Sequence, residues 1–246
     1  MARVALVTGG IGGIGTAICE RLAKDGCTVV ANHHPSESEA ATAWKAERAA
    51  AGFEIDTIAA DVSSFEDSAR MVAEITEKHG PVDVLVNCAG ITRDKTFKKM
   101  ESAQWEAVIN VNLNSCFNCT RPVWEGMLER GFGRIINIAS VNGQRGQFGQ
   151  ANYSAAKAGM HGFTMALAQE GAAKGVTVNT VSPGYVETAM TLAMDDSVRN
   201  AIIGGVPMRR MGMPAEIASA VAFLASDENG YVTGANLPVN GGLFMH

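Results

Sequence analysis

The sequence lacks an excess of basic residues. Its 246 residues include 20 Lys and Arg against 25 Asp and Glu, which gives a net charge of −5 and a pI of about 5.6. Such a chain has no overall positive field for nucleic acid or for an anionic membrane. We therefore expect neither as a partner, although local basic patches can still bind phosphate groups.

Long apolar runs are also missing, and cysteines are few. No segment is apolar over enough residues to span a membrane. Glycines interrupt the opening MARVALVTGG, which predicts a first strand rather than a signal peptide. The cysteines are odd in number and scattered, which argues against a disulfide framework and favours a reducing cytoplasm; they are Cys19, Cys27, Cys88, Cys116 and Cys119.

One cysteine pair needs separate treatment, because Cys116 and Cys119 form a C-x-x-C. The pair lies in a predicted helical run over 104–130, and a zinc site would need two more ligands at fixed spacing. Buried structural thiols are therefore the favoured interpretation, and no metal is expected.

No linker, repeat or low-complexity tract divides the chain, so 1–246 is predicted to be a single domain. Short β-branched runs alternate with amphipathic helical stretches. The runs are nearly all apolar, as in a parallel sheet covered by helices on both faces. They are 3–8, 28–32, 54–60, 82–87, 134–140, 176–182 and 236–240. This predicts an α/β, Rossmann-type doubly wound fold with a seven-stranded parallel sheet between helices.

Segment 183–213 departs from this alternation. It has two prolines before Met213, five methionines and weak periodicity. A substrate loop or lid is predicted there, with an irregular surface connection as the alternative.

A glycine-rich turn follows the first predicted strand, in 8-TGGIGGIGTAICERLAKDG-26. Gly9, Gly13 and Gly15 would allow a tight turn and bring backbone N–H groups close to a pyrophosphate at a helix N-terminus. Because the motif lies between a predicted strand and a predicted helix, dinucleotide binding is favoured over a turn without a ligand.

Polar or small residues end four further predicted strands. They are Asp61-Val62, Asn87-Cys88-Ala89-Gly90, Ser140 and Pro183-Gly184. Ligands of doubly wound sheets bind at the carboxyl ends of the strands. Four such ends in succession favour a site over ordinary loop chemistry.

Tyr153 and Lys157 lie four residues apart in 150-QANYSAAKAG-159, so on a helix they share one face. Close helix packing would explain the small residues around them. The alternative is chemical, because a nearby cation stabilises a phenolate and makes the phenol a better proton exchanger.

Together these motifs resemble the short-chain dehydrogenase/reductase family over essentially the whole chain. The resemblance implies that Tyr153 gives a proton to a substrate carbonyl, that Lys157 assists it and binds the nicotinamide ribose, and that Ser140 orients the carbonyl. Asn112 would hold a water for proton relay. The family usually has N-N-A-G where this chain has Asn87-Cys88-Ala89-Gly90, and we expect the cysteine to change packing only.

The same resemblance implies a set of residues that bind the dinucleotide. They are Gly9, Gly13, Ile14, Gly15, Asn32, His33, His34, Glu37, Asp61, Val62, Asn87, Ala89, Gly90, Tyr153, Lys157, Pro183, Gly184, Val186 and Thr188.

Within the family, the chain is most similar to the acetoacetyl-CoA reductases of polyhydroxyalkanoate synthesis. The resemblance lies in 141–170, 90-GITRD-94, 97-FKKM-100 and Pro183-Gly184-Tyr185. It implies reduction of acetoacetyl-CoA, or another short 3-oxoacyl-CoA, to the (R)-3-hydroxyacyl-CoA by a homotetramer. The implied substrate residues are Asp94, Lys99, Ser140, Gln147, Phe148, Gln150, Tyr153, Gly184 and Tyr185.

Gln147 and Gln150 flank Phe148, and their amide groups can bond a thioester and the pantetheine chain. Arg93, Lys98 and Lys99 could form a cationic rim that binds the phosphates of CoA. A solvated basic patch explains the rim about as well. Two alternatives remain, a 3-oxoacyl-[acyl-carrier-protein] reductase and a non-enzymatic nucleotide-sensing protein on the same fold. An intact Ser–Tyr–Lys set argues against the sensor.

Cofactor preference depends on the residues after the second strand, 29-VVANHHPSESEA-40. Neither the acidic residue that binds the NAD ribose nor the arginine that binds the NADP phosphate ends this strand. The next charges are Glu37 and Glu39, which would repel a 2′-phosphate, whereas His33 or His34 could partly compensate. Relatives with this activity use NADPH, but the local charges favour NADH.

Overall fold

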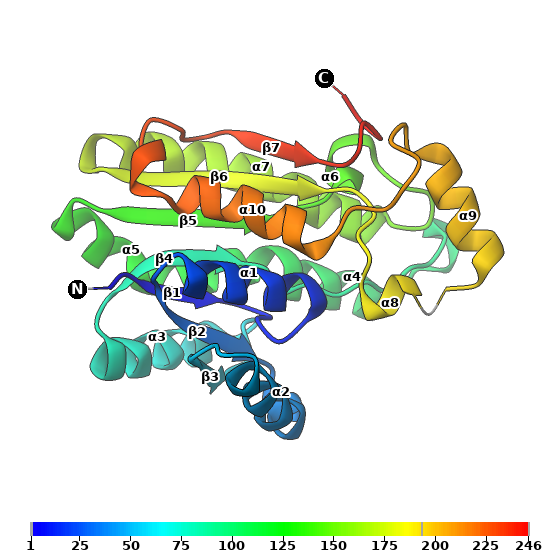
Figure 1. The fold of residues 1–246 in the computed structure, drawn as a ribbon. Helices are drawn as coiled ribbons and strands as arrows, with labels where there is room; N and C mark the ends of the chain where they lie inside the picture. The colour runs from blue at the N-terminus through cyan, green and yellow to red at the C-terminus, as the bar shows by residue number, and fades with distance from the viewer. Residues whose placement is uncertain (1, 193, 246) are drawn as a thin grey trace.

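The computed structural model describes residues 2–192 and 194–245 and has a parallel sheet between two layers of helices (Figure 1). The sheet order is β3-β2-β1-β4-β5-β6-β7. The strands are β1 (Val4–Val7), β2 (Thr28–His33), β3 (Ile55–Ala59), β4 (Val82–Asn87), β5 (Gly133–Ile138), β6 (Val176–Pro183) and β7 (Asn236–Val239). All pairings are parallel, which confirms the predicted fold class.

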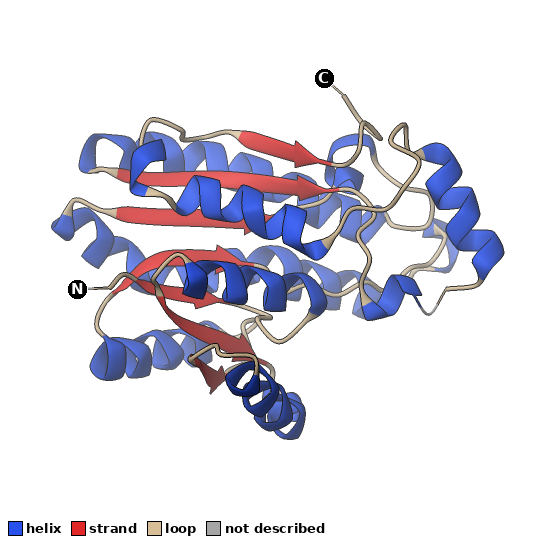
Figure 2. Cartoon of the chain, in the orientation of Figure 1, coloured by secondary structure: helices blue, strands red, loops and turns tan. Residues whose placement is uncertain are grey.

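The helices cover the sheet on both faces (Figure 2). They are α1 (Gly13–Lys24), α2 (Ser38–Ala50), α3 (Phe65–His79), α4 (Ser102–Ile109), α5 (Ser115–Arg130), α6 (Val141–Arg145), α7 (Ala151–Gly171), α8 (Ala189–Leu192), α9 (Asp196–Gly205) and α10 (Pro214–Ala225). No helix within residues 2–192 and 194–245 combines the length and the apolar character that a membrane crossing requires.

Two apolar clusters form the core, one on each face of the sheet. On one face α1 and α10 pack against the strands through Ile18, Leu22, Ile217 and Val221. On the other face α3 and α5 contribute Met71, Ile75, Val123 and Met127. β1, β5 and β6 are buried along their whole length. β1 is entirely apolar, as expected for a strand covered on both faces, whereas β5 and β6 also bury polar side chains such as Asn137, Asn179 and Thr180.

The chain reverses its winding direction between β1 and β4. After β1 the chain builds β2 and β3 on one side, and β4 returns to the other side of β1. In such sheets the crevice outside the carboxyl ends of these two central strands is the usual ligand site. The glycine-rich turn and the Asn87–Gly90 stretch both lie at this switch point.

Segment 183–213 is more regular than its weak periodicity indicates. It contains α8 and α9, which lie beyond the carboxyl ends of the strands (Figure 1). Its two ends pair with each other, because Glu187 N donates to Gly212 O at 2.8 Å and Gly212 N donates to Tyr185 O at 2.9 Å. The segment is thus a loop closed at its base, with residue 193 outside the described part.

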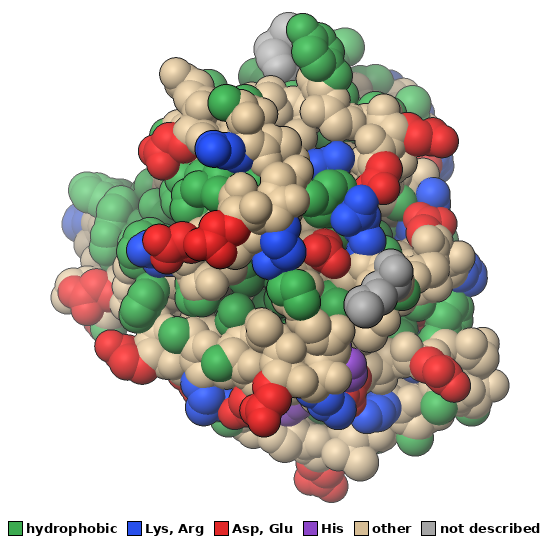
Figure 3. All heavy atoms as spheres, turned by 90° about the vertical axis from the view of Figure 1, so that its left-hand side faces the viewer, with side chains coloured by type: hydrophobic (Ala, Val, Ile, Leu, Met, Phe, Trp, Pro, Cys, Tyr) green, Lys and Arg blue, Asp and Glu red, His purple; other side chains and the backbone are tan. Residues whose placement is uncertain are grey.

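At the amino ends of the strands, Phe132 is held between two guanidinium groups. Arg3 Cζ lies 3.3 Å and Arg134 Cζ 4.3 Å from the centroid of its ring. Arg3 also forms two hydrogen bonds with Asp227, at 2.9 and 2.7 Å. Figure 3 looks onto this face, where acidic and basic side chains intermingle. These contacts join the starts of β1 and β5 to the segment before β7.

Asp56 on β3 is the centre of a second charged cluster. It accepts hydrogen bonds from Lys45, at 2.6 Å, and from Lys78. His79 Nε2 lies 3.1 Å from its carboxylate. Burial alone would raise the pKa of Asp56, but the hydrogen bonds from the two lysines outweigh burial and bring the pKa well below its usual value.

Asp56→Asn should therefore lower the free energy of unfolding by about 1–2 kcal/mol at pH 7. The folded-state pKa is depressed, so this stabilisation is fully present above the unfolded pKa of about 3.9 and is lost as pH falls through the much lower folded-state pKa. Urea unfolding at pH 7 and pH 3 measures the effect, and the difference between parent and variant should be smaller at pH 3 than at pH 7. Asp25→Asn, which removes only an exposed pair with Arg21, should cost less than about 0.5 kcal/mol. Equal losses from both variants at pH 7 would contradict the prediction.

Candidate active site

The glycine-rich turn joins β1 to α1 and packs against the end of β4. Gly9 has a φ of +60°, which glycine adopts without strain. A Cβ on Gly9 would lie 2.9 Å from Ala89 Cα, and a Cβ on Gly15 would lie 2.2 Å from Gly9 O. Thr8 Oγ1 accepts hydrogen bonds from the N–H groups of Cys88 and Ala89 at 3.0 and 3.1 Å. Close backbone approaches therefore account for the glycine pattern.

The N-terminus of α1 has features that suit a phosphate. The helix begins after Gly12, has no side-chain cap and carries no acidic residue in its first turn. Its unpaired N–H groups and the positive end of its dipole would favour an anion. A Cβ on Gly13 would lie 3.0 Å from Thr188 Cγ2, so residues after β6 come close to this turn. The arrangement fits the pyrophosphate of a dinucleotide.

The predicted residues at the end of β2 and just after it divide into two pairs. Asn32 is 2% exposed, and its Oδ1 accepts from Gly9 N at 3.3 Å while its Nδ2 donates to a carbonyl that follows β3 at 3.1 Å. His33 is also buried, and its Nδ1 donates to His34 O at 2.9 Å. Asn32 and His33 thus support the turn from inside. His34 and Glu37 are exposed, and Glu37 Oε2 accepts from His34 N at 3.1 Å.

Asp61 and Val62 follow β3 and also have partners within the protein. Asp61 Oδ1 accepts from Ser63 N at 2.9 Å and from Ser63 Oγ at 2.7 Å. The carbonyl of the buried Val62 accepts from Asn118 Nδ2 at 2.9 Å.

Asn87 lies in a buried hydrogen-bonded network rather than at an open surface. It is 2% exposed, and its Nδ2 donates to Asn137 Oδ1 at 2.8 Å. Asn137 Nδ2 donates to Thr164 Oγ1 at 2.8 Å, which in turn lies 2.8 Å from Thr180 Oγ1. This network links β4 and β5 to α7 and β6. Asn87 therefore has a structural role that its place in the motif does not reveal.

The predicted residues after β6 lie where the loop 183–213 leaves the sheet. Pro183 is the last residue of β6, and Gly184 N donates to Val239 O at 2.9 Å. Val186 is buried and pairs with Gly212. These contacts, together with Thr188 beside Gly13, bring the start of the loop next to the glycine-rich turn.

Tyr153, Lys157 and Ser140 come from two neighbouring helices, α7 and α6. Lys157 is 3% exposed; its Nζ donates to Ile138 O at 2.8 Å and lies 5.6 Å from the centroid of the Tyr153 ring. Ser140 is the N-cap of α6, where its Oγ accepts from Asn142 N at 3.1 Å. A hydroxyl has one hydrogen and two lone pairs, so the Ser140 hydrogen stays available to a substrate oxygen.

Asn112 lies in a π-helix, η3 (Asn110–Asn114), between α4 and α5. Its Nδ2 donates to two main-chain carbonyls, each at 2.9 Å. Its Oδ1 is buried and has no hydrogen-bond partner among the residues described. A Cβ on Gly90 would lie 2.6 Å from that oxygen and 3.5 Å from Lys157 Nζ. A buried acceptor close to an ammonium suits a bound water, as the family resemblance implies for Asn112.

Gly143 allows α6 to pack directly on α7, and the sequence motifs do not single it out. A Cβ there would lie 2.7 Å from the carbonyl carbon of Lys157 and 2.9 Å from Ala158 N. Any side chain at this position would separate the helices that carry Ser140 and Lys157. Because the contact joins two helices, no local sequence pattern could have revealed it.

Asn152 is a second residue that the sequence motifs miss, although it precedes Tyr153. It is 0% exposed, and its Oδ1 accepts from Tyr153 N at 2.8 Å. Its Nδ2 donates to Arg93 O and Gln104 O, each at 3.1 Å. Asn152 thus anchors the first turn of α7 to the segment that follows β4.

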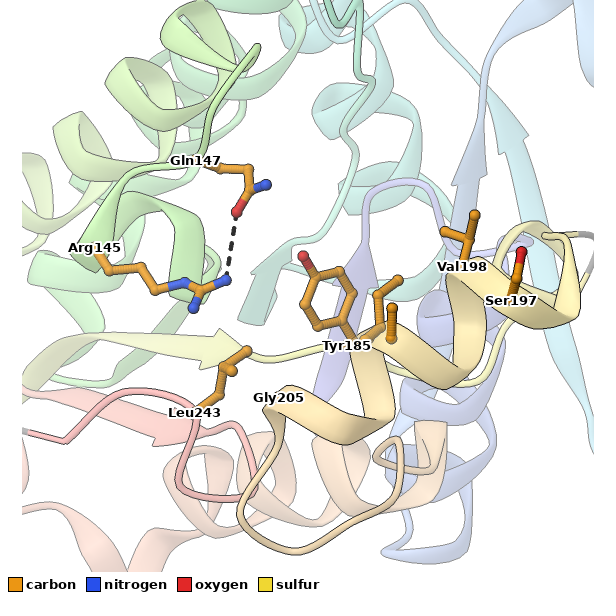
Figure 4. A pocket seen from close by; sticks show the side chains of 9 residues that line it. Arg145, Gln147, Tyr185, Ser197, Val198, Gly205 and Leu243 are labelled. Carbon is orange, nitrogen blue, oxygen red and sulfur yellow. Dashed lines mark hydrogen bonds between the residues drawn. The ribbon is translucent and has the colours of Figure 1, made fainter.

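A cavity of about 540 Å³ lies between the loop before α7 and helix α9 (Figure 4). Of the predicted substrate residues, Gln147 and Tyr185 line it. Arg145, missed from the sequence, also lines the cavity, and its Nη2 donates to Gln147 Oε1 at 3.4 Å. Helix α9 forms a mainly apolar wall, and Leu243 of the C-terminal segment lies on the side of Arg145. The lining residues of α9 are Ser197, Val198, Ala201, Ile202 and Gly205.

The remaining predicted substrate residues do not line this cavity. Phe148 is 87% exposed, and Lys99 is exposed in the short helix η2 (Phe97–Lys99). Gln150 Nε2 donates to Asp94 Oδ2 at 2.7 Å, so these two side chains are partners of each other. Gly184 packs on Asn240, to whose Cα a Cβ would come within 2.8 Å.

Cys116 and Cys119 are buried, and Cys88 is half-buried. Desolvation raises the pKa of Cys88 and of Cys116 to about 11 and that of Cys119 to about 12. Cys88 packs against the core cluster that includes α1, in line with the expected change of packing only. Cys116 Sγ donates to Asn112 O at 3.5 Å, and Cys119 Sγ donates to Ser68 Oγ at 3.7 Å.

Comparison with known proteins agrees with this geometry. The chain is 82% identical over its full 246 residues to an acetoacetyl-CoA reductase of Allochromatium vinosum, with all of both chains covered. It is 54% identical to an acetoacetyl-CoA reductase of Cupriavidus necator over 99% of this chain and 98% of the relative. It is 46% identical to a 3-oxoacyl-[acyl-carrier-protein] reductase of Vibrio cholerae, with the same coverage. Residues 3–198 match the family described as short chain dehydrogenase, and the chain belongs to this family.

Proposed function

We propose that the protein reduces acetoacetyl-CoA, or another short 3-oxoacyl-CoA, to the (R)-3-hydroxyacyl-CoA that polyhydroxyalkanoate synthesis uses. The observation that carries the proposal is the arrangement of Ser140, Tyr153 and Lys157 on α6 and α7, at the same sheet edge as the glycine-rich turn. The full-length relative at 82% identity, an acetoacetyl-CoA reductase, supports the substrate.

In the proposed reaction a reduced nicotinamide dinucleotide supplies the hydride to the 3-oxo carbon. The glycine-rich turn and the start of α1 would hold its pyrophosphate. Ser140 donates a hydrogen bond to the carbonyl oxygen, where negative charge develops. Tyr153 gives its proton to that oxygen, so the ketone becomes an alcohol and the tyrosine a phenolate.

The tyrosine must then regain a proton. Lys157 Nζ has three hydrogens and uses one on Ile138 O. The others can stabilise the phenolate and bond the nicotinamide ribose. Asn112 Oδ1, which like Lys157 Nζ lies close to Gly90, can hold a water that returns a proton toward Lys157.

We propose NADH as the preferred cofactor, because Glu37 has an exposed carboxylate held at the end of β2. A 2′-phosphate on the adenosine ribose would meet this negative charge. Two partly solvated charges a few ångströms apart repel by about 1 kcal/mol or more. We therefore expect kcat/KM to be about tenfold higher for NADH than for NADPH.

Replacing Glu37 and Glu39 together with Gln should raise kcat/KM for NADPH about tenfold and leave NADH use largely unchanged. A glutamine in place of Glu37 can still accept from His34 N, so the change removes charge and keeps the turn. Steady-state kinetics with both cofactors at saturating acetoacetyl-CoA measures this, and added salt should narrow the parent's bias. A parent that prefers NADPH would refute the proposal.

Two alternative functions use the same fold. A 3-oxoacyl-[acyl-carrier-protein] reductase would reduce only carrier-bound substrate, and the relative at 46% identity carries that name. A nucleotide-sensing protein would bind cofactor without turnover. A panel of acetoacetyl-CoA, acetoacetyl carrier protein and ethyl acetoacetate, each with NADH and NADPH, separates the three.

We also propose a homotetramer in the cytoplasm, with 183–213 as a substrate lid. The helices that hold Asn112 and Tyr153 would form an interface, and Phe117 on α5 is 51% exposed and stacks on Phe65 at 5.8 Å. Helix α9 forms one wall of the cavity, which supports the lid. Light scattering at several protein concentrations tests the assembly.

A further inference from the structure

A chain of hydrogen bonds runs from the surface to the predicted catalytic serine. Gln150 Nε2 donates to Asp94 Oδ2 at 2.7 Å, and Asn142 Nδ2 donates to Gln150 Oε1 at 3.0 Å. Asn142 N donates to Ser140 Oγ at 3.1 Å. We call Asp94, Gln150, Asn142 and Ser140 the Asp94 relay. Its outer end is exposed, whereas Asn142 and Ser140 are 8% and 9% exposed.

The relay has a fixed direction because its first member can only accept hydrogen bonds. An ionised carboxylate has no hydrogen, so Gln150 must turn its amide nitrogen toward Asp94. The Gln150 oxygen then faces Asn142, which must present its own amide nitrogen. One exposed carboxylate thereby sets the orientation of two amide groups in series.

This orientation fixes Asn142, two residues after Ser140. With its side chain held by Gln150, Asn142 sits in the first turn of α6 and directs its backbone N–H at Ser140 Oγ. That bond occupies a lone pair and leaves the Ser140 hydrogen for the substrate oxygen. The main chain supports the outer end, since Lys95 N donates to Gly149 O at 2.9 Å.

We propose that Asp94 is a positioning residue, which acts through Gln150 and Asn142 to hold Ser140 in its reactive orientation. The inference rests on the proposed reduction and deepens it. It departs from the resemblance, which gives Asp94 and Gln150 direct contact with the substrate. In the structure the two side chains are bonded to each other.

Two isosteric single variants and their combination test the relay. Asp94→Asn offers an amide that can donate or accept, so the direction is lost, and we expect kcat to fall about tenfold. Gln150→Glu brings two carboxylates together and should lower kcat similarly. In the double variant, the introduced asparagine can donate to the introduced glutamate, which can also accept from Asn142. The direction is restored, and kcat should return to within about threefold of the parent.

Each variant is measured with acetoacetyl-CoA and with ethyl acetoacetate, alongside KM for NADH and the isotope effect of 4-deuterated NADH. The relay predicts equal kcat losses on both substrates, an unchanged KM for NADH, and a larger isotope effect in the single variants. A double variant as slow as the product of its singles would overturn the proposal. So would losses confined to KM for acetoacetyl-CoA, which would indicate direct contact with CoA.

Failure of the proposed function gives a different result. If the parent reduces ethyl acetoacetate as well as acetoacetyl-CoA, the CoA assignment is wrong. The ratio of each variant's kcat to that of the parent still tests the Asp94 relay in that case. Thermal unfolding of all four proteins controls for stability. Because the substitutions are isosteric, we expect similar midpoints, and a kcat loss that follows the melting temperature would contradict positioning.

Discussion

Tyr153→Phe should reduce kcat by about 100- to 10,000-fold, because general acid catalysis contributes a factor of this size. The substitution removes only the phenolic oxygen. The ring keeps its place in the first turn of α7 and its contact with Lys157, whose Nζ lies 5.6 Å from the ring centroid. The loss should therefore fall on proton transfer and leave cofactor binding intact.

Stopped-flow turnover of acetoacetyl-CoA measures the loss, and quenching of protein fluorescence by NADH measures binding. The dissociation constant for NADH should stay within a few-fold of the parent value. A variant that retains kcat within a few-fold of the parent would remove Tyr153 from the chemistry. A variant that no longer binds NADH would show that the hydroxyl serves binding instead.

Gly143→Ala should lower kcat by about 100-fold, the second largest effect that the structure predicts. The new methyl group would overlap the backbone of α7 at Lys157 and Ala158, with separations of 2.7 and 2.9 Å. Backbone atoms cannot rotate away as a flexible side chain can, so α6 must move and carry Ser140 with it. Overpacking of this kind also costs about 1–3 kcal/mol of stability.

Gly162→Ala provides the matched control on α7, where a Cβ would meet no atom within 4 Å. There alanine should leave kcat unchanged and stabilise the helix by up to about 1 kcal/mol. Chemical denaturation and steady-state kinetics on both variants separate the two effects. If Gly143→Ala turned over as fast as Gly162→Ala, the packing of α6 on α7 would not control the position of Ser140.

Much of the fold could be predicted from the sequence, because local chemistry determines it. The seven strands are runs rich in β-branched residues, and each lies within two residues of its expected place. The Tyr153–Lys157 spacing also has a purely helical explanation. These features are determined by residues close together in the sequence, so the sequence alone is enough to predict them.

Features that depend on residues distant in the chain could not be predicted. Asn87 ends a strand at the switch point, yet its side chain is committed to Asn137, 50 residues away. The helical run over 104–130 contains a π-helix at Asn112, which the apolar pattern does not distinguish from α-helix. Gly143 matters through the contact between two helices, and the Asn142 side chain through its bond to Gln150, and no spacing rule covers either.

The contacts of Arg3 and Arg134 with Phe132 have a consequence for engineering the stability of this protein. Arg3, Arg134 and Asp227 stabilise the amino ends of the strands, whereas the predicted catalytic groups lie at the carboxyl ends. Effects of substitutions that share no partners usually add. Thermal stability could therefore be engineered at the amino ends of the strands, and substrate range at their carboxyl ends. Changes at the two edges could be combined freely, because neither would have to compensate for the other.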